Sequence, residues 1–273
     1  MVTKPLVFDG GNLTLNMSTS GAGSIQVEIQ DVAGQPVPGY DLADCPEVFG
    51  DELVALILYG SGADRHYIPG KSDLNFLVVL TERGMEDLEK AMAVAARWRE
   101  SRVATPLFMT KDYIGAALDA YPIEFLDMKL NHVMVYGEDV LTTLEIRPEY
   151  LRLQVERELR GKLLLLRQRF LETEGKDKEL RRLIRESLPA FLTAFKALLW
   201  LLGREIPRER PEIVEAAARA AGVGAETFRK CLLVREGKDN YSPGEIMALL
   251  REYLREIAGL CRRIDELSFP TAG

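Results

Sequence analysis

The 273-residue chain contains 47% hydrophobic and 28% charged residues, an ordinary composition for a globular protein with one large or two modest domains. The formal net charge of −7 argues against a general nucleic-acid-binding protein, because surfaces that follow phosphates are strongly basic. The charge is uneven, since residues 147–273 hold 25 Lys and Arg against 20 Asp and Glu, and residues 1–146 hold 10 against 22. We expect either two differently charged surfaces or a basic face for an anionic partner.

Three cysteines, Cys45, Cys231 and Cys261, are far apart and odd in number, so we expect neither a disulfide framework nor a zinc site. Buried free thiols in a reducing compartment are the simplest interpretation. The first residues lack the apolar core of a signal peptide. The longest apolar stretch, 191–202, is interrupted by Lys196 and is too short to span a bilayer. These features predict a cytoplasmic protein without a membrane segment.

The first 48 residues predict a short β-rich extension. Apolar and polar residues alternate with a period of two in 12–16 and 24–30, and glycine-rich turns separate these runs. This pattern is typical of three or four short strands. So small a unit is marginal by itself, and we expect it to pack on the rest of the chain or to be loosely attached.

Residues 49–146 alternate strand and helix patterns, which predicts an α/β or α+β unit with helices on one or both faces of a sheet. The predicted elements, in chain order, are an apolar strand or helix end at 53–59, a strand at 75–80, a helix at 85–102, an apolar segment at 106–109, an amphipathic turn through Ala120, and strands near 123–128 and 133–136.

Residues 147–273 contain no strand pattern and predict a bundle of four or five helices. We expect the second helix to bend at Pro189 and the last to begin at Ser242 and Pro243, an N-cap followed by proline at the first helical position. A leucine-rich stripe along the first helix predicts a core face. The predicted helices are 149–171, 178–202, 211–221, 225–234 and 243–267.

The residues with the clearest chemistry follow the first predicted strand. A glycine turn, Gly60-Ser61, comes first, and Asp73 and Asn75 then open the next strand. Backbone N–H groups of a glycine turn and of a following helix can face phosphate oxygens. A carboxylate about a dozen residues later can hold the divalent cation that neutralises the same phosphates. Residues 73 and 75 point to one side of a strand because the side-chain period is two.

This arrangement resembles the nucleotidyltransferase superfamily related to DNA polymerase β, whose pattern is Gly-Ser, a spacer and Asp-x-Asp on a strand. With the bundle behind it, the chain from about residue 50 to 268 is similar to the kanamycin-nucleotidyltransferase-like group. The resemblance implies a nucleotidyltransferase domain of α+β or α/β class at 49–146, a helical bundle at 147–273 and the β-rich extension at 1–48. It implies transfer of a nucleoside monophosphate from an NTP, which we expect to be ATP, to a hydroxyl of a small molecule or protein, with release of pyrophosphate.

The resemblance also implies roles for individual residues. Asp73 and Asn75 are predicted to hold Mg²⁺ or Mn²⁺, with Asn75 offering a neutral oxygen where the superfamily has a second Asp. The superfamily places a third carboxylate on a neighbouring strand, often as general base. Glu124 is the preferred residue for that position, as base and metal ligand, and Asp127 is the alternative. The predicted catalytic residues are thus Asp73, Glu124 and Asp127.

Phosphate contacts are predicted from residues in and after the glycine turn. Each also has a purely structural interpretation: a serine can cap a helix, a charged loop residue can be solvated, and Asp73 can cap a strand edge. His66 is expected to be a loop residue and His132 a structural one. The predicted nucleotide-binding residues are Gly60, Ser61, Arg65, Lys71 and Ser72.

Two other functions stay open at this stage. Asn75, and the lack of an acid near Pro106, are compatible with a degenerate module that binds a nucleotide or a protein partner without catalysis. The first 45 residues resemble a β-sandwich fragment of glycoside-hydrolase-type proteins around 13–16, 23–29 and 38–40, which implies carbohydrate binding. The sequence contains none of the motifs that are typical of zinc hydrolases, Cys–His proteases, P-loop proteins or Rossmann dinucleotide sites. The sequence leaves a homodimer or a protein partner open.

Overall fold

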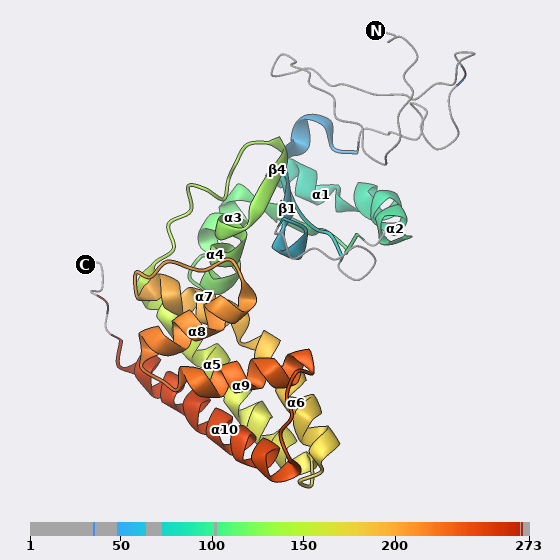
Figure 1. Ribbon diagram of the computed structural model, residues 1–273. Coiled ribbons are helices and arrows are strands. Elements are labelled where there is room, and N and C mark those ends of the chain that lie inside the picture. Colours follow the sequence, from blue (N-terminus) through green and yellow to red (C-terminus); the bar gives the residue numbers. More distant parts are fainter. Residues whose placement is uncertain (1–34, 36–47, 64–72, 101–102, 268, 270–273) are drawn as a thin grey trace.

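The computed structural model describes residues 35, 48–63, 73–100, 103–267 and 269 (Figure 1). The predicted β-rich extension and its β-sandwich likeness lie outside the described residues, apart from Gln35 and Val48. The described chain forms a small sheet with flanking helices, followed by an all-helical bundle (Figure 1). The predicted class, an α+β unit ahead of a C-terminal helical bundle, is therefore confirmed.

The sheet has four strands in the order β3-β2-β1-β4. β1 pairs antiparallel with β2 and with β4, while β2 pairs parallel with β3 after a crossover through three short helices. The two central strands supply the core, since Ala55, Ile57 and Leu77 have no exposed surface. β2 and β4 confirm the strands predicted at 75–80 and 133–136. The strands are β1 Leu53–Tyr59, β2 Asn75–Leu80, β3 Leu107–Thr110 and β4 His132–Gly137.

The helix predicted at 85–102 is divided in the structure. Thr81 caps a first short helix by accepting a hydrogen bond from the Gly84 N–H at 3.1 Å. The residue after that helix, Asp87, leaves helical geometry, with φ at −107° and ψ at 30°. The prediction of one continuous helix was wrong, because periodicity does not register a backbone turn between two apolar runs. The resulting elements are α1 Glu82–Glu86, the 3₁₀ helix η4 Leu88–Ala91 and α2 Met92–Glu100.

The strand predicted at 123–128 is also wrong: this segment forms the helix α4, Pro122–Leu130, which follows α3, Lys111–Ala116. Proline in the first turn favours a helix start, because its φ is already helical and its missing N–H is not needed there. The buried positions 122, 123, 125, 126 and 128 follow helical spacing rather than alternation. An apolar run this short does not distinguish the two by pattern. As a consequence, Glu124 and Asp127, three residues apart, share one helix face.

The bundle confirms the predicted helical region, with one difference at Pro189. The expected bend there is a break, because α6 ends at Ala190 and α7 begins at Leu192; a proline ring removes an N–H and crowds the preceding turn. The leucine-rich stripe of α5, from Leu151 to Leu166, is buried as predicted. The helices are α5 Pro148–Glu172, α6 Asp177–Ala190, α7 Leu192–Leu201, α8 Arg210–Ala221, α9 Ala225–Glu236 and α10 Pro243–Asp265.

The start of α10 is confirmed in detail. The Ser242 N–H donates to the Glu245 carboxylate at 2.7 Å, and the Glu245 N–H donates to the Ser242 hydroxyl at 3.4 Å, a reciprocal capping box. Cys231 and Cys261 are buried free thiols as predicted, and Cys45 lies outside the described residues. No helix within the described ranges is long and apolar enough to cross a membrane.

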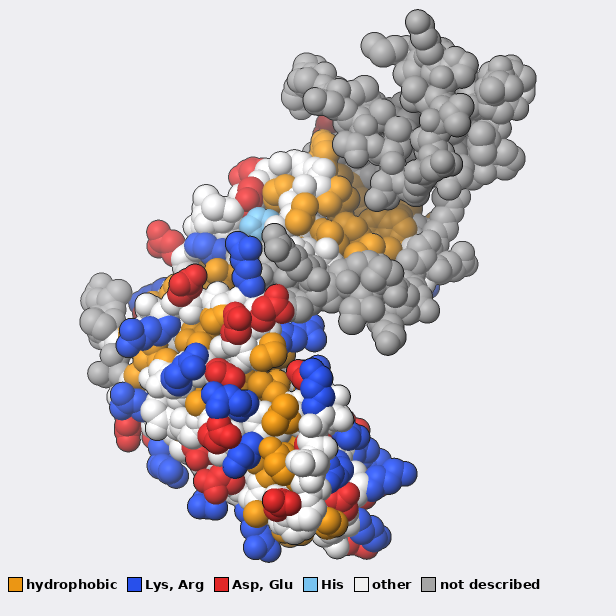
Figure 2. Space-filling view, viewed as in Figure 1, with side chains coloured by type: hydrophobic (Ala, Val, Ile, Leu, Met, Phe, Trp, Pro, Cys, Tyr) orange, Lys and Arg blue, Asp and Glu red, His pale blue; other side chains and the backbone are white. Residues whose placement is uncertain are grey.

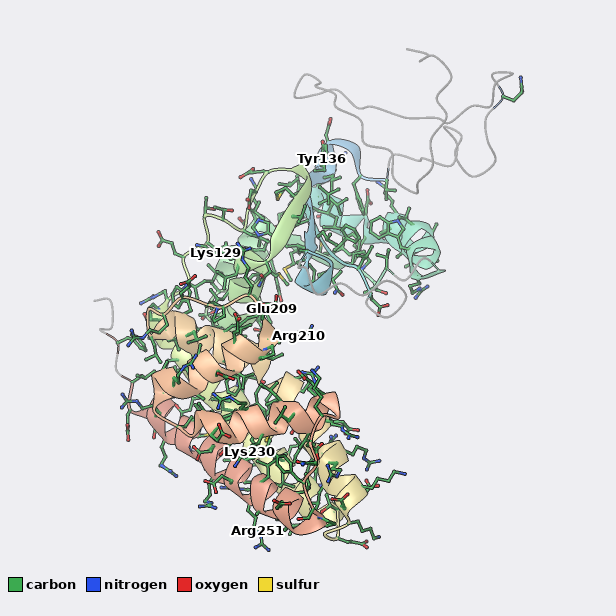
Figure 3. The ribbon with its side chains drawn as sticks, viewed as in Figure 1. Lys129, Tyr136, Glu209, Arg210, Lys230 and Arg251 are labelled. Carbon is green, nitrogen blue, oxygen red and sulfur yellow. The ribbon has the colours of Figure 1, made fainter. Side chains whose placement is uncertain are left out.

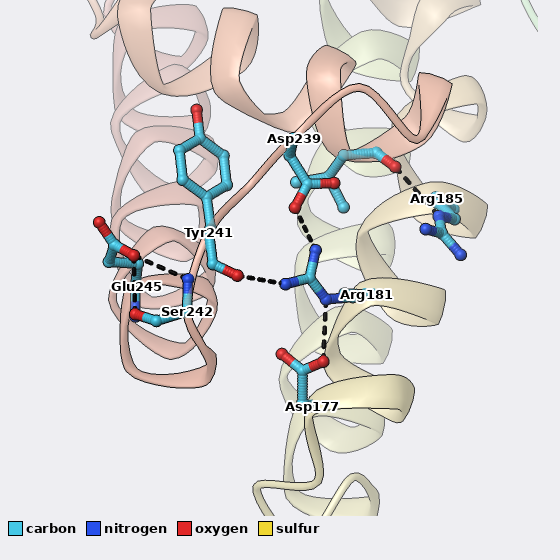
Figure 4. A network of polar contacts seen from close by, with 8 residues as sticks. Asp177, Arg181, Arg185, Asp239, Tyr241, Ser242 and Glu245 are labelled. Atoms are coloured by element: carbon cyan, nitrogen blue, oxygen red, sulfur yellow. Dashed lines mark hydrogen bonds and ion pairs between the residues drawn. The ribbon is translucent and has the colours of Figure 1, made fainter.

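Arg181 joins α6 to the loop that precedes α10 (Figure 4). Its Nε donates to Asp177 at 2.9 Å, its Nη1 donates to Asp239, and its Nη2 donates to the Tyr241 carbonyl at 2.5 Å. The Asp239 side chain is 3% exposed, so the guanidinium neutralises a buried carboxylate. Over the bundle face in Figure 2, basic and acidic side chains are interspersed rather than gathered into one basic patch.

Candidate active site

Three strand ends meet at one edge of the sheet. Tyr59, the last residue of β1, pairs with Asn75 at the start of β2 and with His132 at the start of β4. Gly60 follows with φ +69°, a left-handed conformation that glycine adopts without steric cost. A Cβ built on Gly60 would lie 3.5 Å from Asn75 Nδ2. The glycine turn therefore passes directly beside the Asn75 side chain.

The other predicted phosphate and metal residues surround this turn in the sequence. Asp73 is exposed, and its neighbour Leu74 forms a parallel bridge with Val103, so the chain is already extended before β2 begins. The backbone of Ser61 belongs to the 3₁₀ turn η3, Gly60–Gly62, while its side chain is not described. The predicted residues Arg65, Lys71 and Ser72, and also His66, lie outside the described residues.

Glu124 and Asp127 lie on α4, which packs against α5 and α7 of the bundle. Glu124 Oε2 accepts a hydrogen bond from Gln154 Nε2 at 2.7 Å. Asp127 Oδ1 forms an ion pair with Lys196 Nζ at 2.8 Å and also accepts a hydrogen bond from Asn131 Nδ2 at 3.3 Å. Both carboxylates thus belong to a helix between the sheet and the bundle. The expectation that they lie on a neighbouring strand was wrong, for the reason given for α4.

Two cavities adjoin along this boundary and share Asp127 and Thr193. The first, of about 330 Å³, is called the acidic cavity here, and the second, of about 250 Å³, the basic cavity. Both are formed by residues of the sheet unit and of the bundle together. The polar lining of the acidic cavity includes Tyr59, Glu124, Glu158 and Lys162; that of the basic cavity includes Gly60, Asn131, Lys196, Arg208 and Arg210.

In the acidic cavity the carboxylates differ in their partners. Glu158 forms an ion pair with Lys162, one turn further along α5. Glu124 has only the neutral amide of Gln154 as a side-chain partner among the described residues. Burial raises the pKa of Tyr59 above its ordinary value, so its phenol stays protonated at neutral pH and can donate a hydrogen bond. The lining of the acidic cavity therefore includes a carboxylate that has no ion-pair partner among the described residues and a hydroxyl donor.

The basic cavity collects cations from the bundle at the glycine turn. Lys196 comes from α7, Arg210 is the first residue of α8, and Arg208 lies in the loop before it. Arg210 lies at the end of α8 that faces the sheet unit (Figure 3). Arg208 is exposed and has no ion-pair partner in the part of the chain that the structure describes. Guanidinium and ammonium groups around a left-handed glycine turn suit a phosphate-bearing ligand.

His132 has the structural role that the sequence predicted. Its Nδ1 lies 3.0 Å from the Met128 carbonyl oxygen and its Nε2 lies 3.2 Å from Asp139 Oδ2. Burial of Asp139 opposes ionisation, but hydrogen bonds from Thr142, His132 and the Leu141 N–H outweigh it and lower the pKa of Asp139 to about 2. The ring therefore ties the end of α4 to the loop after β4.

The described donors at this site are few for a metal ion. Within the described ranges, no group of three or more His, Cys, Asp or Glu side chains is placed to hold one. Asp73 and Asn75 supply one carboxylate and one amide oxygen from the edge of the sheet. Mg²⁺ is commonly held by one or two carboxylates together with substrate phosphates. The residues present fit a cation that is bound together with phosphates; Glu124 as a third ligand stays a prediction.

Sequence reasoning missed the bundle residues that complete both cavities. Lys196, Arg208 and Arg210 lie far from the glycine turn in the chain, and no local pattern links them to it. One local signal existed: Lys196 interrupts the longest apolar stretch, and a charge in such a position needs a partner. That partner, Asp127, was itself assigned to a strand.

The sequence matches no protein-family model and no curated protein. Among solved structures, the chain is similar to the spectinomycin adenyltransferase AAD(9) from Enterococcus faecialis, determined with ATP and spectinomycin. The TM-score is 0.45 and the sequence identity 15%, over 81% of this chain and 95% of that one. This similarity concerns the course of the chain and assigns no ligand to it.

Proposed function

We propose that the protein is a nucleotidyltransferase that moves a nucleoside monophosphate from an NTP to a hydroxyl of an acceptor bound between the sheet unit and the bundle. The observation that carries this proposal is the pair of adjoining cavities, one basic and beside Gly60, the other containing Glu124. A polyanionic donor and a hydroxyl acceptor need sites of such different charge next to each other. Proximity and orientation are most of what this reaction requires from a protein.

The basic cavity would receive the triphosphate. The N–H groups of the glycine turn and the cations Lys196, Arg208 and Arg210 would face its oxygens, and Ser61, Arg65, Lys71 and Ser72 would add contacts from the following segment. Asp73 and Asn75 would hold Mg²⁺ or Mn²⁺ with the phosphates, where the ion would neutralise their charge. ATP is the expected nucleotide.

The acidic cavity would receive the acceptor, with Glu124 as general base. The acceptor hydroxyl oxygen attacks the α-phosphorus, the bond from that phosphorus to the pyrophosphate oxygen breaks, and the hydroxyl proton passes to Glu124. Asp127, shared by both cavities, would orient the acceptor. A cavity of about 330 Å³ is of the size that binds small molecules, which favours a small acceptor over a protein side chain.

A thermal-shift panel of ATP, GTP, CTP and UTP, each with and without Mg²⁺ or Mn²⁺, tests this function without a known acceptor. Ligand at about 100 times its Kd stabilises by about 2.7 kcal/mol, or several degrees for a chain of this size. We expect a metal-dependent shift with one nucleotide that is abolished by Asp73→Ala. Asp119→Ala removes an exposed carboxylate outside both cavities and is the matched control. No shift with any nucleotide would refute the proposal.

The alternative is a module that binds a nucleotide without transferring it. It is favoured by Asn75, which stands beside the glycine turn where the superfamily has a second carboxylate. Asn75→Asp separates the two functions. In an enzyme, the added carboxylate raises metal-dependent pyrophosphate release from ATP. In a binding module, it changes nucleotide affinity only.

A further inference from the structure

Gln154 of α5 is an unusual residue, because it is a buried amide at the boundary between the bundle and the sheet unit. Over the whole residue it is 5% exposed, and by that measure the other buried polar residues among those described are threonines. A buried amide is costly unless both of its ends are hydrogen-bonded. Both ends of Gln154 have partners on α4, and neither partner belongs to its own helix.

The two hydrogen bonds fix the orientation of the amide. Gln154 Oε1 accepts from the Ile123 N–H at 2.7 Å, and Nε2 donates to Glu124 Oε2 at 2.7 Å. A backbone N–H can only donate, so the oxygen of the amide must face Ile123. The NH₂ group must then face Glu124, whose Oε2 accepts its hydrogen bond. Glu124 lines the acidic cavity, and its Oε1 has no hydrogen bond to the described residues.

The same contact replaces a helix cap. The first N–H groups of a helix have no partner within it, and the N-cap of α4, Tyr121, provides no side-chain hydrogen bond within the described chain. Gln154 satisfies one of these N–H groups from the bundle. The first turn of α4, which carries Glu124, is therefore held by a residue of the opposite unit.

We propose that Gln154 is a positioning residue for Glu124: it holds the carboxylate as a proton acceptor aimed into the acidic cavity. The geometric part of this inference depends only on the two hydrogen bonds. The catalytic part rests on the proposed function, in which Glu124 accepts the acceptor's proton. Of the other charged side chains that line this cavity, Glu158 pairs with Lys162, and Asp127 pairs with Lys196 of the basic cavity.

A substitution cycle tests the geometry. Gln154→Glu keeps an oxygen for Ile123 but sets a second acceptor against Glu124, so we expect a Tm loss of about 5 °C. In the double variant, Gln154→Glu with Glu124→Gln, the amide at position 124 donates to the carboxylate at position 154. We expect this exchanged pair to recover most of the Tm loss.

The matched control is the same cycle on the exposed pair of α5, where Gln168 Nε2 donates to Glu172 at 3.2 Å. Gln168→Glu is expected to change Tm by no more than about 1–2 °C. Equal losses for Gln154→Glu and Gln168→Glu, or no recovery in the exchanged pair, would overturn the geometry.

Pyrophosphate release from ATP, with water as acceptor, tests the positioning role. Water oxygen attacks the α-phosphorus, pyrophosphate leaves, and a water proton passes to Glu124, so AMP and pyrophosphate are the products. Gln154→Leu keeps Glu124 but removes the hydrogen bond that orients its carboxylate. We expect kcat to fall by about 10²-fold with KM for ATP unchanged. Gln168→Leu should leave both constants unchanged.

The outcomes separate the two proposals. A Gln154→Leu protein that is destabilised but retains wild-type kcat well below its Tm would show a purely structural amide and overturn the positioning role. A wild-type protein that binds ATP but releases no pyrophosphate would overturn the proposed function and with it the catalytic role of Gln154. The substitution cycle would still decide the geometry.

Discussion

Replacing Lys196 with alanine tests the division of the site into a basic and an acidic cavity. Lys196 pairs with Asp127 at 2.8 Å, and the two side chains are 22% and 30% exposed. A partly exposed pair of this kind contributes about 1 kcal/mol at most, and the carboxylate left behind keeps its hydrogen bond from Asn131 and some solvent. We therefore expect the Tm of Lys196→Ala to fall by only about 2–4 °C.

The effect on nucleotide binding should be larger than the effect on stability. A charged hydrogen bond to phosphate is worth about 1.5–3 kcal/mol, which corresponds to a Kd for ATP raised by about 10- to 150-fold. Isothermal titration calorimetry of ATP with Mg²⁺ measures this directly. Raising the salt concentration should reduce the difference between wild type and variant, because the lost interaction is electrostatic.

Lys162→Ala is the matched control. Lys162 pairs with Glu158 in the acidic cavity, and the two side chains are 29% and 37% exposed, close to the values for the Lys196 pair. It should cost similar stability and leave the Kd for ATP unchanged. Equal losses of ATP affinity in the two variants, or none in Lys196→Ala, would refute the assignment of the triphosphate to the basic cavity.

Three further predictions concern the fold and its charges. Arg181→Ala leaves the buried Asp239 carboxylate without its cation and should cost about 3–5 kcal/mol in chemical denaturation. The pKa of Asp139, about 2, lies below its ordinary value, so its contribution to stability is present above about pH 4 and is lost as the pH falls toward 2. Asp139→Asn should lack this part of the acid-induced loss. Gly60→Ala should cost about 1–2 kcal/mol, because φ is +69° there.

Each of these has a control. Arg251→Ala, at an exposed position of α10, should be near neutral, and an equal loss there would refute the role given to Arg181. An acid denaturation curve of Asp139→Asn parallel to that of the wild type would contradict the lowered pKa. Gly115→Ala, inside α3 and with nothing near its built Cβ, should not destabilise the protein, in contrast to Gly60→Ala.

Local patterns were sufficient for most of the helical bundle. The stripe that begins at Leu151 has the period of a helix with one buried face, and the cap at Ser242 is a local hydrogen-bond arrangement within four residues. The pattern gave the wrong element for the segment that forms α4. A short apolar run that is buried on both faces fits the side-chain period of a strand as well as that of a helix. That one error assigned Glu124 and Asp127 to the sheet, whereas the structure places them on a helix at the boundary with the bundle.

Local sequence patterns were enough to predict an α+β part followed by a helical bundle, and a glycine turn ahead of a strand that begins at Asn75, with Asp73 just before it. These features depend on residues close together in the chain. The side chains that meet at the turn became known from the folded chain alone: Lys196, Arg208 and Arg210 line the same cavity as Gly60. Such contacts depend on how the sheet unit and the bundle pack together. The spacing of residues within either unit does not give the distance between side chains of the two.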